Sequence, residues 1–155
     1  MKSSTTIVVI AAMSEKRVIG SDGKLPWHYP KDMERFERLT SGNPVILGRK
    51  THENIVSKLG STLPDRTHIV VTSTPNSDGF ADEVITAGSI DGAIEAGEKI
   101  CRTSRQGSAI YVAGCESIYE QTMNLADRIE LTQIHEEYSG DAYFPELDAG
   151  TCVEE

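Results

Sequence analysis

A carboxylate near the start of an expected helix is the first group in this sequence that could do chemistry. Asp32 follows Pro30, and proline suits the first position of a helix because no backbone donor is lost there. Apolar residues then recur at helical spacing and predict a buried face: Met33, Phe36 and Leu39. Asp32 lies beside that face. A carboxylate there either complements the helix dipole or accepts paired hydrogen bonds from a bound ring.

A cationic turn is the second such group. The run Gly48-Arg49-Lys50-Thr51 directly follows the apolar run Val45-Ile46-Leu47, so it stands where a strand is expected to pass into a helix. Backbone N–H groups at such a turn, with two cations beside them, attract phosphate. Ser73 follows the next apolar strand and could assist. The run is also compatible with an ordinary solvated turn.

Several familiar catalytic patterns are absent from the sequence. It contains no G-x-G-x-x-G after the first expected strand, no P-loop, no H-E-x-x-H and no G-x-S-x-G. The three cysteines form no C-x-x-C pair, so neither a disulfide framework nor a zinc site is expected. The histidines are not at metal-ligand spacing: His28, His52, His68 and His135. We therefore expect no metal.

The composition fits a globular protein with an acidic surface. The 155 residues are 38% hydrophobic and carry a net charge of −9. The acidity argues against nucleic acid or an anionic membrane as a partner, although adaptation to salt would look similar. The longest apolar run, Ile7 to Met13, is too short to span a membrane, and no signal peptide is recognisable. We expect a cytoplasmic protein.

Expected strands and helices alternate along the chain. Strands are predicted at 5–13, 43–48, 67–73, 83–87, 108–113 and 127–135, and helices at 30–40, 50–58, 89–102 and 116–124. This order predicts an α/β fold with a mostly parallel central sheet and helices on both faces. We expect a single domain over residues 1–155. Residues 14–29 form a connection long enough to suggest a functional loop.

A series of short motifs in a fixed order carries a family resemblance. Leu25-Pro26-Trp27 is followed by an acid five residues after the tryptophan, then by Gly48-Arg49-Lys50-Thr51 and by Leu63-Pro64-Asp65-Arg66. Val112-Ala113-Gly114 and Gly140-Asp141-Ala142-Tyr143-Phe144-Pro145 follow later. Together these motifs resemble the dihydrofolate reductase family, from residue 6 to about residue 147.

The resemblance implies an activity and a set of site residues. The implied reaction, which belongs to one-carbon metabolism and tetrahydrofolate biosynthesis, is NADPH-dependent reduction of 7,8-dihydrofolate to 5,6,7,8-tetrahydrofolate. Hydride goes to pterin C6 and a proton to N5. The implied catalytic residues are Asp32, Trp27 and Thr132. Substrate contacts are expected at Ala11, Ala12, Met33, Phe36, Ile55, Leu63, Arg66 and Tyr119. Cofactor contacts are expected at Ala12, Ile19, Gly20, Gly48, Arg49, Lys50, Thr51, Thr72, Ser73, Gly114, Cys115, Glu116, Ser117 and Ile118.

The sequence also departs from the family pattern. Relatives usually have two adjacent glycines, joined by a cis peptide bond, where this chain has Gly114-Cys115, and many have a basic residue in place of Ser117. With the negative charge of Glu116, this predicts weaker cofactor binding. Relatives also continue with a β-hairpin beyond Phe144-Pro145, which this chain is expected to lack. We expect a monomer that binds dihydrofolate and antifolate-type molecules, with dimerisation through the bare sheet edge as the alternative.

Two other functions remain open from the residues alone. One is a related pyrimidine reductase of riboflavin synthesis, although Trp27, Asp32 and Arg66 suit a folate better than a ribityl phosphate. The other is a non-catalytic folate-binding homologue, which the missing hairpin and Cys115 would allow.

Overall fold

Helices and strands alternate in the computed structural model, which describes residues 5–20, 30–60, 62, 66–74, 84–103, 109–114, 116–134, 137 and 139–145. The strands are β1 (Thr6–Met13), β2 (Val18–Gly20), β3 (Pro44–Gly48), β4 (Thr67–Val71), β5 (Ile85–Ala87), β6 (Ala109–Val112), β7 (Arg128–Gln133) and β8 (Ala142–Tyr143). The helices are α1 (Pro30–Thr40), α2 (Arg49–Leu59), α3 (Ile90–Thr103) and α4 (Glu116–Thr122). None of the helices in these ranges is long and apolar enough to cross a bilayer.

Six strands form one sheet in the order β5-β4-β3-β6-β1-β7. Every pairing in this sheet is parallel. The chain steps from β1 through β3 and β4 to β5, and then returns through β6 to β7 on the other side of β1. The prediction of a mostly parallel central sheet is confirmed.

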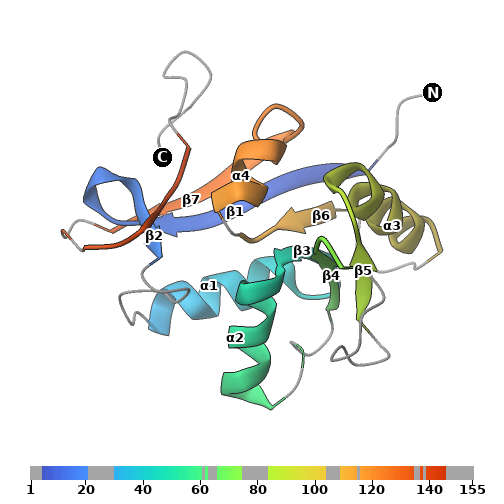
Figure 1. The fold of residues 1–155 in the computed structure, drawn as a ribbon, viewed down its shortest axis with the longest axis horizontal. Coiled ribbons are helices and arrows are strands. Elements are labelled where there is room, and N and C mark those ends of the chain that lie inside the picture. Colours follow the sequence, from blue (N-terminus) through green and yellow to red (C-terminus); the bar gives the residue numbers. More distant parts are fainter. Residues whose placement is uncertain are drawn as a thin grey trace.

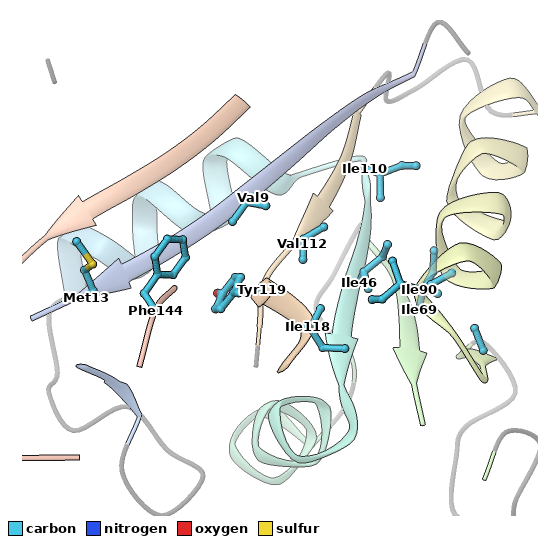
Figure 2. Packing of buried hydrophobic residues seen from close by; sticks show 12 residues of the cluster. Val9, Met13, Ile46, Ile69, Ile90, Ile110, Val112, Ile118, Tyr119 and Phe144 are labelled. Atoms are coloured by element: carbon cyan, nitrogen blue, oxygen red, sulfur yellow. The ribbon is translucent and has the colours of Figure 1, made fainter. Parts of the chain in front are cut away.

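Alternating apolar residues bury both faces of the sheet. Val8, Ile10, Val45, Leu47 and Tyr111 form a cluster on one face, against which Phe36 and Leu39 of α1 and Ile55 of α2 pack. The opposite face carries the larger cluster, shown in Figure 2, which takes in residues of α3 and α4: Ile90, Ala93, Ile118 and Tyr119. Figure 1 shows α1 and α4 on opposite sides of β1. Because both faces are covered, β1 and β3 are almost continuously apolar, whereas β7 at the edge of the sheet also carries polar residues.

A second, two-stranded sheet joins segments that lie far apart in the sequence. β2 pairs with β8 in antiparallel fashion, with Val18 opposite Tyr143. Arg17 strengthens the junction, because its guanidinium donates to the Phe144 carbonyl at 2.9 Å while its own carbonyl accepts from the Phe144 N–H at 2.8 Å. Phe144 is fully buried, and its ring centroid lies 5.1 Å from that of Tyr119. The β2–β8 pair is thereby fixed to the core.

The predicted elements agree with the structure, apart from small shifts at their ends. The helix at 30–40 is confirmed with the bounds that the sequence suggested, and the other three helices begin or end one or two residues away. The sequence did not predict β2, β8 or the short 3-10 turn at Glu15–Arg17.

Candidate functional site

The carboxyl ends of the parallel strands meet at one edge of the sheet. This edge holds Ala12 near the end of β1, Gly48 at the end of β3, Thr72 just after β4, Gly114 two residues after β6 and Thr132 near the end of β7. Two hydrogen bonds prolong the β3–β6 ladder toward it, from Ala113 N to the Ile46 carbonyl at 3.0 Å and from Gly48 N to the Gly114 carbonyl at 2.8 Å. Ligands of open α/β sheets bind outside such an edge.

The start of α2 offers backbone donors at this edge. The N-cap residue is Gly48, which has no side chain that could cap the helix. No acidic residue lies in the first turn of α2. The first N–H groups of an α-helix have no partner within the helix. The electrostatics of this end therefore favour a bound anion.

Arg49 extends the same site toward the end of β4. Its Nε atom lies 2.9 Å from Glu53 Oε1, and its Nη1 donates to Thr74 Oγ1 at 3.1 Å. Thr72 is buried and accepts from the Thr74 N–H at 3.2 Å, whereas Ser73 and Lys50 are exposed and Thr51 is half-buried. The structure thus brings the Arg49 guanidinium after β3 beside the Thr74 hydroxyl after β4. Glu53 and Thr74 were not predicted, although the i, i+4 spacing of Arg49 and Glu53 was visible.

Gly114 occupies a backbone conformation that other residues rarely adopt. Its φ is +119°, and a Cβ atom there would lie 3.3 Å from the Tyr119 hydroxyl. That hydroxyl donates to the Ile10 carbonyl at 2.9 Å and so joins α4 to β1. Tyr119, predicted as a substrate contact, is 5% exposed and belongs to the core. The glycine allows the chain to pass close to Tyr119.

The predicted contacts at the start of α4 have different surroundings. Glu116 Oε1 accepts a hydrogen bond from the Tyr143 N–H at 3.0 Å, so its carboxylate is held by β8. Ser117 is exposed, and Ile118 is buried in the larger cluster. Cys115 lies outside the described residues.

The other end of the edge contains Thr132, which lies opposite Ala12 in the β1–β7 pair. Arg35 of α1 reaches this strand, with Nη1 3.4 Å from Thr132 Oγ1 and Nη2 2.7 Å from Glu130 Oε2. Asp32 is in the first turn of α1, one helical turn before Arg35. The side chains of Asp32 and Met33 lie outside the described set. Neither Arg35 nor Glu130 was predicted, since nothing local indicates a contact between residues 97 positions apart.

Arg66 is oriented by the end of α1. Its Nε donates to Thr40 Oγ1 at 2.7 Å, and its Nη2 donates to the Glu37 carbonyl at 2.6 Å. Thr40 Oγ1 in turn donates to the Phe36 carbonyl at 2.7 Å. These bonds hold the guanidinium on the α1 side of the sheet, the face that also carries Phe36 and Ile55.

The remaining predicted residues divide into two groups. Ala11 and Ile19 are half-buried against the larger cluster, and Gly20 ends β2. Trp27 and Leu63 lie outside the described residues.

Two buried histidines form a contact between α2 and β4. His52 of α2 and His68 of β4 are 4% and 1% exposed. Burial, together with the charges of His52 and Arg66, lowers the pKa of His68 to about 4. Burial also lowers the pKa of His52, against a smaller opposing effect of Glu53. Both imidazoles are therefore neutral at pH 7, and their pairing fixes α2 on β4.

Comparison with known proteins identifies the family. The family model for dihydrofolate reductase matches residues 6–153. Dihydrofolate reductase HdrB of Haloferax volcanii is 38% identical over 153 residues, covering 98% of this chain and 77% of the relative. The dihydrofolate reductase of Bacillus subtilis is 39% identical over 142 residues, covering 92% of this chain and 77% of its own length.

A solved structure agrees with these relatives. Dihydrofolate reductase from Enterococcus faecalis, in complex with NADP(H) and RAB-propyl, superposes with a TM-score of 0.76 at 32% identity and covers 97% of this chain and 83% of its own. Family model, relatives and fold agree over nearly the whole sequence. This chain belongs to the dihydrofolate reductase family.

Proposed function

We propose that this chain reduces 7,8-dihydrofolate to 5,6,7,8-tetrahydrofolate with NADPH, through the residues predicted from the sequence. The observation that carries the assignment is the shared sheet edge. The cationic turn after β3 and Thr132 of β7 lie at the carboxyl ends of parallel strands in the same sheet. A long ligand and a reducing cofactor can meet along such an edge.

The residues present fit a phosphorylated dinucleotide. The N-terminus of α2, Arg49 and Lys50 supply donors for the phosphate that distinguishes NADPH from NADH. The Thr74 hydroxyl lies beside Arg49, with the Thr72 hydroxyl next to it, and Ser73 is assigned to the same phosphate site. Gly114 leaves space where a Cβ would meet Tyr119. When bound, NADPH supplies the hydride that is added to pterin C6. The remaining contacts are assigned to Ala12, Ile19, Gly20, Gly48, Thr51, Cys115, Glu116, Ser117 and Ile118.

The folate is assigned to the α1 side of the edge. Asp32 accepts hydrogen bonds from pterin N3–H and from the 2-amino group, which suits a carboxylate because both of its oxygens accept. Thr132 donates to Asp32, and Trp27 holds a water near the ring. Arg66 receives the α-carboxylate of the glutamate tail, and the hydrogen bonds from its Nε and Nη2 to α1 lower the cost of orienting it.

The assay that tests this proposal follows NADPH oxidation with and without dihydrofolate and identifies the product by chromatography. We expect oxidation only with dihydrofolate present, and tetrahydrofolate as the product. Oxidation that requires a ribityl aminopyrimidine instead would assign the chain to the pyrimidine reductases. Folate binding without turnover would make it a non-catalytic homologue.

We further propose that the chain works in the cytoplasm as a single-domain monomer and that it binds antifolates in the folate site. The single domain is supported by the six-stranded sheet, to which the four helices in the described part of the chain connect. Light scattering tests the oligomeric state, and competition between an antifolate and dihydrofolate tests the shared site.

A further inference from the structure

The guanidinium of Arg35 joins α1 to two residues of β7. Nη2 lies 2.7 Å from Glu130 Oε2, and Nη1 lies 3.4 Å from Thr132 Oγ1. Alternate residues of a strand face the same way, so Glu130 and Thr132 present their side chains to α1 together. The planar fork of arginine can engage both, whereas a lysine ammonium would reach only one.

A second arginine fixes the carboxylate that holds Arg35. Arg128, also on this face of β7, places its Nε 2.9 Å from Glu130 Oε1. Each carboxylate oxygen thus has its own guanidinium. Glu130 is 25% exposed and Arg35 is 32% exposed, whereas Arg128 is 53% exposed. The Glu130 carboxylate is thus fixed by two arginines. Its ion pair with Arg35 Nη2 orients Arg35 Nη1 toward Thr132.

The contact restricts what the Thr132 hydroxyl can do. A hydroxyl has one donor and two acceptor positions, and a guanidinium only donates. The Arg35 N–H therefore occupies one lone pair of Thr132, and the hydroxyl hydrogen must point to another acceptor. One lone pair remains for an N–H of a ligand.

We propose that Arg35 is a positioning residue that fixes the Thr132 hydroxyl as a donor to Asp32 and an acceptor for the 2-amino group of the folate. The proposal rests on the proposed function, because that function supplies Asp32 and the pterin as partners. Asp32 precedes Arg35 by three residues in α1, and residues three apart are neighbours along a helix. Arg35 thereby contributes to affinity for 2-aminopterins without touching the ring.

The proposal differs from a purely structural role for the α1–β7 contact. If Arg35 only held α1 against β7, replacing it would lower the stability of the fold and would have no specific effect on folate binding. A positioning role changes folate affinity through the Thr132 hydroxyl, and this effect disappears when the hydroxyl is absent. Arg128 provides a matched control, because it contacts the same carboxylate.

The experiment compares Arg35→Gln, Arg35→Lys and Arg128→Gln, with Arg35→Gln repeated in a Thr132→Val background. The readouts are the Kd for folic acid from tryptophan fluorescence, KM and kcat for dihydrofolate, and the melting temperature. Losing an oriented hydrogen bond to a charged group predicts about a tenfold rise in folic acid Kd and in KM for Arg35→Gln, with kcat within about twofold. For Arg128→Gln, we expect the folic acid Kd, KM and kcat each to stay within about twofold of the wild-type values.

Two further results are expected. Arg35→Lys keeps the ion pair with Glu130, so it melts like the wild type but binds folic acid as weakly as Arg35→Gln, which also covers the case in which the glutamine variant folds poorly. In the Thr132→Val background, Arg35→Gln changes the Kd by less than about twofold, because the group through which it acts is gone.

Equal effects of Arg35→Gln and Arg128→Gln on folic acid binding would overturn the proposal. So would an undiminished effect of Arg35→Gln in the Thr132→Val background. A wild-type chain that neither binds folic acid nor oxidises NADPH with dihydrofolate would instead overturn the proposed function, and the positioning role with it.

Discussion

His52 Nδ1 lies 2.8 Å from His68 Nδ1, and the two rings meet nearly edge to face at 78°. One nitrogen must donate and the other must accept, so the two neutral rings take complementary tautomers. The pair holds the helix that begins with Arg49 against the strand that follows Arg66. It thus links the two cationic regions of the proposed site through buried side chains.

This pair makes stability depend on pH. The pKa of His68 is about 4 in the folded protein against an ordinary value of 6.5, so the unfolded chain binds more protons between these values. The free energy of unfolding therefore falls as the pH drops from about 6.5 to about 4, by at most about 1.4 kcal/mol per pH unit for one histidine. Urea unfolding at several pH values measures this slope, and His68→Asn is expected to reduce it. A variant with the wild-type slope would exclude His68 as its source.

Replacing both cations of the turn tests the cofactor assignment. We expect Arg49→Ala combined with Lys50→Ala to weaken NADPH binding while leaving NADH binding nearly unchanged, because only the additional phosphate is lost as a partner. The salt dependence of NADPH affinity should flatten as well, since fewer charges are screened. Fluorescence titration of both cofactors at two salt concentrations measures these effects. Equal weakening for both cofactors would remove these residues from the phosphate site.

Glu53 is expected to oppose NADPH binding. Its carboxylate pairs with Arg49 at 2.9 Å, and both side chains are exposed, so the pair itself stabilises the fold little. Glu53→Gln removes a negative charge beside the proposed phosphate site and releases Arg49 from this ion pair. We expect NADPH to bind about two- to fivefold tighter, on the scale of one exposed ion pair. The gain should vanish at high salt and be absent for NADH, and a gain shared by NADH would contradict the assignment.

Asp32→Asn tests the catalytic assignment. Asparagine keeps the size of the side chain but removes the negative charge and places a donor toward the pterin. Losing one well-aimed electrostatic group costs about 100- to 1,000-fold in turnover. We expect such a loss, with NADPH binding within a few fold and residual activity that rises toward low pH, where the substrate arrives protonated. Near-normal turnover with an unchanged pH profile would leave Asp32 as a helix-dipole residue.

Gly114→Ala tests the backbone of the proposed cofactor site, with Gly42→Ala as its control. Both glycines have positive φ, but a Cβ at Gly42 would meet nothing within 4 Å, whereas at Gly114 it would meet Tyr119. We expect Gly42→Ala to cost about 1 kcal/mol of stability from backbone strain alone. Gly114→Ala should cost up to about 3 kcal/mol and also weaken NADPH binding. Equal costs measured by chemical unfolding would show that the Tyr119 contact is unimportant.

The sequence predicted what depends on local pattern. Helix α1 could be located because Pro30 marks its start and Phe36 and Leu39 mark its buried face, and β3 because its residues are continuously apolar. β2 and β8 have three and two residues, and their pairing brings together residues 18 and 143, so no periodicity indicates it.

The same distinction applies to the site. The turn at Arg49 follows from a strand that leads directly into a helix, and its role was predicted from that order. The side chains that contact Arg49 and Thr132 in the structure were not predicted. Thr74 and Arg35 reach them across the fold, and such contacts depend on how strands are ordered in the sheet rather than on neighbouring residues.

The position of β1 in the sheet has a consequence for synthesis on the ribosome. β1 is the first strand of the sheet to be made, yet both of its neighbours, β6 and β7, begin only at Ala109 and Arg128. β3, β4 and β5 pair among themselves and can assemble earlier. β1 therefore has no strand partners during most of translation. In the folded protein it contains three almost completely buried residues, Val8, Val9 and Ile10. During that interval the nascent chain exposes an apolar, aggregation-prone strand. The yield of folded protein should therefore depend on chaperones and on the speed of elongation.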